Sequence, residues 1–445
     1  MALDLTSIPE LPRDEAFAVT ADFKADTHPQ KVSLGAGVYR DEHSQPWILS
    51  SVREAKKRIH DDPTLDHEYL PIQGHGPFLE AARNLILGEN KDSSRPWIRP
   101  GSVISVQTIS GTGANSLAAS FLSNTLKPKH VFFSDPTWSN HSLIWEVHAP
   151  GVIRKTYPHH YAAGTRKLDV EAIISTFEET AIEGDVVILH ACAHNPTGID
   201  PSHEQWSTLA EVIKRKRLFA LFDSAYQGFA SGDFDDDAWA VRYFGDTLCG
   251  DSTESQNTGI GLGICQSFAK NFGLYGERVG AFHLVLPSPG PSPSSMSAEE
   301  DLGSAEPKAG AGAKSHLLRL IRSNISNAPL FGARIVAMVL GTPELREMWE
   351  RDLRTMSGRI ERMRSLLRAE IERDSDVGDW SFLEGQIGMF SYTGLSERQV
   401  DRLRDVHHIY LMRNGRVSMS GVNEGNVKYV AEAIVEVVRY YQSDR

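Results

Sequence analysis

Residues 102–126 read Ser-Val-Ile-Ser-Val-Gln-Thr-Ile-Ser-Gly-Thr-Gly-Ala-Asn-Ser-Leu-Ala-Ala-Ser-Phe-Leu-Ser-Asn-Thr-Leu. The apolar, β-branched run Ser102–Ile109 predicts a strand, and Ser110–Gly113 predicts a turn. Ala114–Leu126 then predicts a helix. Similar short apolar strands precede turns at Val131–Phe133, Val186–Leu189 and Leu218–Phe222. Strands that alternate with helices in this way predict an α/β fold with a mostly parallel sheet covered on both faces, and ligands bind such sheets at the carboxyl ends of the strands.

Two segments look inserted into this pattern. Residues 246–261 are polar and glycine-rich, and residues 287–313 are of low complexity and predict a disordered surface excursion. Gly310–Ser315 imitates a phosphate-binding loop, but no apolar strand leads into it. After Gly332 the chain becomes helix-rich, which indicates a second, smaller α+β domain.

Composition narrows the classes of function. The 445 residues carry 46 basic and 58 acidic side chains, a net charge of −12, which argues against nucleic acid as the main partner. The three cysteines are widely spaced and predict neither a disulfide framework nor a metal cluster. No apolar run reaches the roughly 18 residues of a membrane span. The first ten residues contain acids and no arginine, so no targeting segment is predicted and a cytoplasmic location is expected.

Lys270 stands between apolar neighbours in residues 263–280, Gly-Ile-Cys-Gln-Ser-Phe-Ala-Lys-Asn-Phe-Gly-Leu-Tyr-Gly-Glu-Arg-Val-Gly. Burial disfavours a charged lysine, and a neutral amine can form an imine with a carbonyl. The alternative is a solvated surface lysine. Ser267 and Arg278 flank it and could hold a phosphate, so the stretch predicts a ligand that is both an aldehyde and a phosphate. That description fits pyridoxal 5′-phosphate (PLP).

Asp223 ends a buried apolar strand, where a carboxylate is costly unless it meets a cation or strong donors. It could keep the ring nitrogen of PLP protonated, or it could be a helix N-cap. Tyr226 and Asn195 could both reach the phenolic oxygen of the ring, although a core tyrosine is the alternative for Tyr226. Trp138 could stack on the ring or be an ordinary buried tryptophan.

The turn Ser110–Gly113 presents backbone N–H groups and hydroxyls to an anion at the start of a helix. With Ser267 and Arg278 it predicts a phosphate site. His190 and His194 do not have metal-ligand geometry in a strand-to-turn passage, and support of Asp223 is the expected role of His190 and of His141.

Two arginines bear on the substrate. Arg322 and Arg416 carry guanidinium groups that match carboxylates bidentately, and two of them imply a dicarboxylic substrate. For either arginine alone, a surface residue is the alternative.

Taken in order, these motifs resemble the aspartate aminotransferases of the class I, fold-type I PLP enzymes, in their eukaryotic branch. The resemblance extends from about Phe17 to Tyr440, apart from the two inserts. It rests on Leu34-Gly-Ala-Gly-Val-Tyr-Arg40, His67-Glu-Tyr-Leu-Pro-Ile72, Ser134-Asp-Pro-Thr-Trp-Ser-Asn-His141, residues 190–198, Phe222-Asp-Ser-Ala-Tyr-Gln-Gly-Phe229 and residues 266–280.

The resemblance implies PLP as cofactor and Lys270 as the Schiff-base lysine and proton shuttle. Asp223 would contact the ring nitrogen, Tyr226 and Asn195 the phenolic oxygen, and Trp138 the ring face. The phosphate would be held by Ser110, Gly111, Thr112, Ser267 and Arg278.

The resemblance also implies a homodimer with shared active sites. Tyr69 would reach the partner's phosphate and Arg322 the partner's distal substrate carboxylate, while Arg416 and Gly37 would bind the α-carboxylate. The small domain would combine residues 1–50 with 327–445, around a large PLP-binding domain of residues 51–326.

The sequence departs from the family near Arg322, where Ile325-Ser-Asn-Ala328-Pro replaces an aromatic residue followed by Ser-Asn-Pro-Pro. The predicted reaction is transamination between aspartate, or a similar dicarboxylic amino acid, and 2-oxoglutarate. PLP-dependent elimination, replacement or decarboxylation of a dicarboxylic amino acid is the alternative. A nicotinamide dehydrogenase would need a Gly-x-Gly-x-x-Gly turn after the first strand, and this sequence does not contain one there. A catalytically silent binding module would be expected to lack Lys270 or Asp223, and both residues are present.

Overall fold

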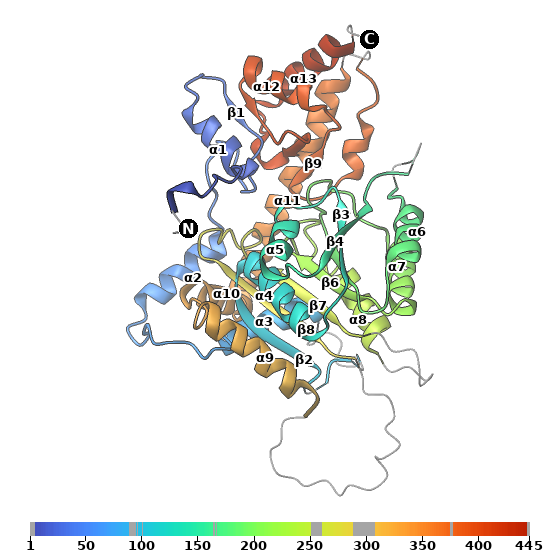
Figure 1. Ribbon diagram of the computed structural model, residues 1–445. Coiled ribbons are helices and arrows are strands. Elements are labelled where there is room, and N and C mark those ends of the chain that lie inside the picture. Colours follow the sequence, from blue (N-terminus) through green and yellow to red (C-terminus); the bar gives the residue numbers. More distant parts are fainter. Residues whose placement is uncertain are drawn as a thin grey trace, which may run out of the picture. The chain divides into compact units, whose positions relative to one another are not determined.

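The computed structural model describes residues 5–88, 95, 97–99, 101–162, 165, 167–250, 260–287, 308–373 and 377–442 (Figure 1). The chain divides into two compact units. The larger unit comprises Trp47–Glu361 and Gly385–Gly388, and the smaller comprises Met1–Pro46, Arg362–Glu384 and Met389–Arg445. The smaller unit thus contains both ends of the chain.

The second boundary lies later in the chain than the predicted one at residue 327. The reason is that α10 (Phe331–Gly341) packs on α2 (Ser50–Asp61) and on α3 (Gly76–Leu87), which belong to the larger unit. The long helix α11 (Pro343–Glu372) is divided between the two units.

A seven-stranded sheet runs through the described part of the larger unit, in the order β2-β8-β7-β6-β5-β3-β4. Strand β8 is antiparallel to both of its neighbours, and the other neighbouring pairs are parallel. The strands are β2 (Val103–Ile109), β3 (His130–Asp135), β4 (Ile153–Pro158), β5 (Val186–His190), β6 (Phe219–Ser224), β7 (Leu262–Ser267) and β8 (Val279–Val285). The predicted mostly parallel α/β sheet is therefore confirmed.

Alternate side chains of the strands build two cores, one on each face of the sheet. In β6, Phe219 and Leu221 pack in a core with α4 (Ser110–Thr125), α5 (Asn140–His148) and α9 (Lys308–Asn324). Ala220 and Phe222 face the other core, which contains α6 (Val170–Thr180), α7 (His203–Arg215) and α8 (Trp239–Cys249). Because both faces are covered by helices, the central strands β5 and β6 are apolar up to their carboxyl ends, where His190 and Asp223 follow.

Three sequence predictions are modified. Helix α4 begins at Ser110 rather than Ala114, so the predicted turn forms the first turn of the helix. The first insert overlaps the end of α8, and its residues 251–259 lie outside the described residues. In the second insert, residues 288–307 lie outside the described residues, and Gly310–Ser315 lies within α9.

The smaller unit joins the two ends of the chain in short sheets. Strand β1 (Val32–Ser33) pairs in parallel with β10 (Ile409–Tyr410), and β9 (Phe390–Tyr392) pairs antiparallel with β11 (Arg416–Ser418). Its helices outside α11 are α1 (Glu15–Ala25), α12 (Glu397–His407) and α13 (Val427–Gln442). None of the described helices in either unit is long and apolar enough to cross a membrane.

Candidate active site

The predicted cofactor residues of the larger unit come from neighbouring strand ends. His190 of β5 pairs with Asp223 of β6, and Asp223 pairs with Cys265 of β7. Asn195 follows β5, and Lys270 follows β7. Because these three strands are parallel, their carboxyl ends share one edge of the sheet, where ligands bind in such folds.

Asp223 is the buried anion of this edge, only 8% exposed. Its Oδ2 accepts hydrogen bonds from His141 Nε2 at 2.9 Å and from Asn115 Nδ2 at 3.2 Å. Burial alone would raise the pKa of Asp223, but the hydrogen bond from His141, helped by the charge of Lys270, holds the pKa below its usual value. Asp223 is therefore a stable carboxylate. It belongs to a strand and does not cap a helix.

A hydrogen-bonded chain fixes the tautomer of His141. Thr137 Oγ1 lies 3.0 Å from His141 Nδ1 and 3.4 Å from His190 Nε2, and the backbone N–H of Asn195 donates to His190 Nδ1 at 3.1 Å. Burial holds the pKa of His190 well below its usual value, so His190 is neutral and donates through Nε2. Thr137 then donates to His141, which donates to Asp223. His141 thus contacts Asp223 directly, and His190 is connected to it through Thr137.

His159 extends this group of buried imidazoles. Its ring stacks on that of His194 with centroids 3.6 Å apart, and its Nε2 donates to the carbonyl of Ile199 at 2.8 Å. His194 in turn contacts Ser134 Oγ through Nε2 at 2.7 Å and Thr197 Oγ1 through Nδ1 at 2.8 Å. Both ring nitrogens of His194 are thus used within the protein, as expected for a structural histidine.

His159 makes stability depend on pH. Burial lowers the pKa of His159 to about 4, whereas the unfolded chain takes up this proton near pH 6.5. The unfolded state therefore binds more protons between these values, and stability rises with pH across the window, by about 3 kcal/mol for this group. We expect His159→Phe to reduce the slope of the free energy of unfolding against pH between 4.5 and 6.5, measured with urea, while the other buried histidines maintain the rest of the slope. His160→Phe, which changes the exposed neighbour, should leave the slope unchanged.

Lys270 lies next to Tyr226, with Nζ 5.1 Å from the centre of the tyrosine ring. The lysine is half-buried, and Tyr226 is 4% exposed. The flanking Phe268 and Phe272 point into the core, where Phe268 packs on Phe78 and Phe272 packs on Trp349. These rings anchor the backbone on both sides of Lys270.

The predicted phosphate site brings together the start of α4 and the loop before β8. Ser110 and Arg278 both have left-handed backbones, with φ of 58° and 55°, and the N–H of Ser110 donates to the carbonyl of Arg278 at 3.1 Å. The hydroxyls of Ser110 and Ser267 are 3.0 Å apart. Helix α4 has no side-chain cap, so its first N–H groups, from Gly111 and Thr112 onward, are suited to an anion. Burial lowers the pKa of Arg278, which remains a cation at neutral pH.

Glycine is required where these segments cross. A Cβ on Gly280 would lie 2.6 Å from the carbonyl carbon of Ser110 and 2.7 Å from the carbonyl oxygen of Gln266, and a Cβ on Gly111 would lie 3.1 Å from Cβ of Ser267. We expect Gly280→Ala to displace the start of α4 and weaken PLP binding by tenfold or more, on the order of 1.4 kcal/mol. Fluorescence titration of the apoprotein would measure this. Gly151→Ala, where nothing lies within 4 Å of the new Cβ, is the control and should bind PLP normally.

These features fit PLP. The ionised Asp223 suits a protonated ring nitrogen, the uncapped helix start suits a phosphate, and Lys270 and Tyr226 lie together. Trp138 packs edge-on against His141 with ring centres 5.1 Å apart, close to the support of Asp223. Asn195 is 8% exposed, in the turn that His190 fixes.

The substrate residues are placed differently. Tyr69 is 83% exposed on the larger unit, and Arg322 is also exposed and donates to Ser326 Oγ. In the smaller unit Arg416 is 8% exposed, donates to the carbonyl of Gly35 at 2.9 Å and lies over the ring of Phe390 at 4.2 Å. A Cβ on Gly37 would lie 3.7 Å from the same ring, so Gly37 and Arg416 share this neighbour.

Sequence reasoning missed Asn115 and Thr137. Asn115 lies four residues after Gly111 on α4 and donates to the carbonyl of Gly111 at 3.0 Å. Helical spacing from Gly111 could have identified it, because residues four apart share a face. Thr137 is part of the string around Trp138, but nothing in the sequence shows that it joins two histidines.

The fold and the strand-end residues define the class of protein, an α/β enzyme of PLP fold type I. Residues 29–434 match the family described as aminotransferase class I and II. The cytoplasmic aspartate aminotransferase of Saccharomyces cerevisiae is 43% identical over 431 residues, covering 97% of this chain and 96% of that one. A solved structure of the cytoplasmic yeast enzyme has a TM-score of 0.88 at 42% identity and covers 98% of both chains.

Two other relatives bear on the amino-acid substrate and on the cofactor. An L-tyrosine:2-oxoglutarate aminotransferase from Aspergillus ustus is 44% identical over 95% of this chain and 76% of its own. An aromatic-amino-acid aminotransferase from Burkholderia pseudomallei, solved covalently bound to pyridoxal phosphate, has a TM-score of 0.84 at 36% identity, covering 98% of this chain and 100% of that one. The chain belongs to the class I and II aminotransferase family. It is a PLP-dependent transaminase acting on small molecules, which confirms the predicted family, cofactor and class of enzyme.

Proposed function

We propose that this transaminase moves the amino group of L-aspartate, or of a similar dicarboxylic amino acid, to 2-oxoglutarate. The observation that carries the proposal is the buried, ionised Asp223, which accepts hydrogen bonds from His141 and Asn115. It lies at the carboxyl end of β6, and Lys270 follows the carboxyl end of the neighbouring strand β7. When bound, PLP stabilises the carbanion formed on the substrate's α-carbon.

The residues of the site divide the work in this proposal, and Lys270 has two tasks. Lys270 holds the cofactor through Nζ and moves the α-proton with the same atom, while Asp223 keeps the ring nitrogen charged. Tyr226 and Asn195 donate to the phenolic oxygen, and Trp138 covers the ring. The phosphate is bound by Ser110, Gly111, Thr112, Ser267 and Arg278, together with Tyr69 of the partner.

Two arginines are proposed to determine the substrate specificity. Arg416, with Gly37, binds the α-carboxylate, and Arg322 binds the distal carboxylate. The loop after Arg322 bears on the role of Arg322, because it contains the apolar residues Ile325 and Ala328. Ala328 is buried, and Ile325 packs on the core next to α9. This loop and the Aspergillus relative favour an L-tyrosine donor as the second candidate.

Half-reaction spectra distinguish the two donors. Purified protein loaded with PLP is titrated with L-aspartate or L-tyrosine, and the glutamate formed from 2-oxoglutarate is assayed. A higher kcat/KM for aspartate, lost in Arg322→Ala, supports the proposal. Faster turnover of tyrosine that survives Arg322→Ala would assign the second donor, and release of ammonia or carbon dioxide from aspartate would indicate elimination or decarboxylation.

A homodimer with shared sites is part of the proposal, supported by the exposure of Tyr69 and Arg322. Mixing Lys270→Ala with Arg322→Ala subunits creates hybrids in which one site has both native residues. If the residues come from different subunits, refolded 1:1 mixtures should regain about a quarter of the native activity. No recovery despite hybrid formation would show that both residues act within one chain.

We also propose a cytoplasmic location. The support is that the relatives from yeast and Caenorhabditis elegans are cytoplasmic enzymes, although mitochondrial relatives from Dictyostelium discoideum and Arabidopsis thaliana are 41% and 40% identical. Cell fractionation with an antibody to the chain tests this, and recovery in mitochondria would contradict it.

A further inference from the structure

Three buried amide side chains stand next to proposed cofactor residues in the sequence. Gln227 follows Tyr226, Gln266 precedes Ser267, and Asn271 follows Lys270. Each of the three amide residues is 1% exposed. Burying an amide side chain costs free energy unless its hydrogen bonds are made. The hydrogen-bond partners of these three amides therefore show which segments the amides connect.

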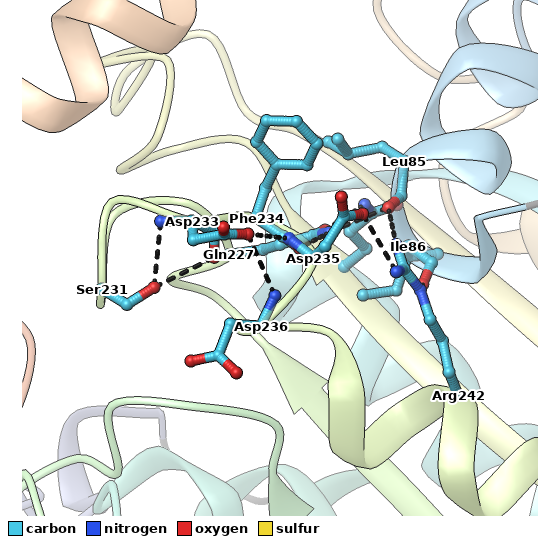
Figure 2. Close-up of polar contacts among 10 residues, drawn as sticks. Leu85, Ile86, Gln227, Ser231, Asp233, Phe234, Asp235, Asp236 and Arg242 are labelled. Atoms are coloured by element: carbon cyan, nitrogen blue, oxygen red, sulfur yellow. Dashed lines mark hydrogen bonds and ion pairs between the residues drawn. The ribbon is translucent and has the colours of Figure 1, made fainter. Parts of the chain in front are cut away.

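Gln227 connects all three segments. Its Oε1 accepts a hydrogen bond from Gln266 Nε2 at 3.3 Å, and its backbone carbonyl accepts one from Asn271 Nδ2 at 3.0 Å. Its own Nε2 donates to the carbonyls of Leu85 and Phe234, both at 2.9 Å (Figure 2). Every donor and acceptor of this amide is therefore used.

The chain of bonds begins in the sheet, on the paired strands β2 and β8. His283 Nε2 is 3.0 Å from Gln266 Oε1, and His283 Nδ1 is 2.8 Å from Ser105 Oγ. Burial lowers the pKa of His283 to about 3, so the ring is neutral. Ser105 then donates to His283, His283 to Gln266, Gln266 to Gln227, and Gln227 to two carbonyls. Bonds aligned in one direction polarise and strengthen one another.

The chain of hydrogen bonds ends, through Gln227, at the C-terminus of α3. Arg242 donates to the carbonyl of Leu85 at 3.1 Å and to that of Ile86 at 3.0 Å, and pairs with Asp235 at 3.0 Å. Figure 2 shows the side chains of Gln227 and Arg242 converging on Leu85. The carboxylate of Asp233 accepts from the N–H groups of Asp235 and Asp236, which closes the loop carrying Phe234. Gln227 is therefore hydrogen-bonded to two segments, the end of α3 and the loop carrying Phe234, that are themselves held by other hydrogen bonds.

We propose that Gln227 is a positioning residue for the transaminase site, which sets the phenol of Tyr226, the amine of Lys270 and the hydroxyl of Ser267 relative to one another. This inference rests on the roles proposed above for those three residues. Gln227 acts through the backbone of its neighbours, because its own side chain is committed to Leu85, Phe234 and Gln266. Displacements of about 1 Å at reacting groups can cost about a hundredfold in rate.

Gln227→Met tests the proposal, because methionine keeps the unbranched shape and removes all three side-chain bonds. Gln266→Met breaks the chain one step further away and keeps the bonds to Leu85 and Phe234. Gln205→Met is the matched control. Gln205 also makes two side-chain bonds, to the N–H of Ser202 and the carbonyl of Leu168, but it lies on α7.

We expect Gln227→Met to lower kcat by about tenfold or more with little change in the KM for the amino acid, and to shift the pH at which the absorbance of bound PLP changes. In the apoprotein, hydrogen exchange should become faster across residues 267–272. Gln266→Met should show the same changes more weakly, and Gln205→Met should lower only the melting temperature.

The outcomes separate this inference from the proposed function. If native protein binds PLP and transaminates while Gln227→Met and Gln266→Met behave like Gln205→Met, the amide chain is only structural and the inference is wrong. If Gln227→Met does not fold, Gln266→Met decides by the same measurements. If native protein itself fails to transaminate, the proposed function fails, and apoprotein exchange still reports whether Gln227 orders residues 267–272.

Discussion

Lys270→Ala is expected to abolish transamination, with kcat lower by about 10⁴-fold. Two tasks disappear together, because Nζ is the proposed attachment point of the cofactor and the proposed carrier of the α-proton. PLP should still bind, since Ser110, Ser267, Arg278 and Asp223 remain. Its absorbance should be that of unattached cofactor, and the substrate amine should bind without turnover.

A matched lysine variant provides the control. Lys167→Ala changes an exposed lysine and should leave both the spectrum and kcat unchanged. The assignment would be wrong if Lys270→Ala kept native turnover and the native spectrum.

Asp223→Asn is expected to lower kcat by about 10³-fold while the protein stays folded. Asparagine has the same shape and can still accept from His141, but it carries no charge with which to keep the ring nitrogen protonated. Asp223→Ala removes the acceptor altogether, so it should also destabilise the fold by about 3 kcal/mol. Stopped-flow half-reactions with aspartate measure the first effect and urea unfolding measures the second.

Asp185 provides the control for this experiment. It is fully buried and accepts from His130 Nδ1 at 2.8 Å, as Asp223 accepts from His141, but it precedes β5, away from the carboxyl ends of the strands. Asp185→Asn should lower the free energy of unfolding and leave kcat unchanged. A normal rate in Asp223→Asn would remove the proposed role of that carboxylate.

The fold, and the grouping of polar residues at the strand ends, could be predicted from the sequence for a physical reason. Apolar strands that end in polar residues are a local pattern, and parallel strands bring those ends together. Asp223 could therefore be connected with Asn195 and Lys270 from sequence alone. Asp223 and Ser110 also have partners far along the chain: His141 and Ser267 were expected from the residues themselves, whereas Asn115 was missed.

The features that sequence reasoning missed depend on long-range contacts. Gln227 looks like an ordinary polar residue of the turn after β6, and Gln266 and His283 look like ordinary polar residues of buried strands, until their pairing is seen. The start of α4 was placed too late, because Ser110 and Gly111 are poor helix formers whose conformation is set by Arg278 and Gly280. The domain boundary was misplaced because the packing of α10 on α2 and α3 is tertiary.

The central claim is that Lys270 holds the cofactor covalently. Reduction of the PLP-loaded protein with borohydride, followed by proteolysis and mass spectrometry, tests it most directly. The account predicts a single phosphopyridoxyl group on the peptide that contains Lys270. A label on another lysine, or no label on protein that has bound PLP, would contradict it.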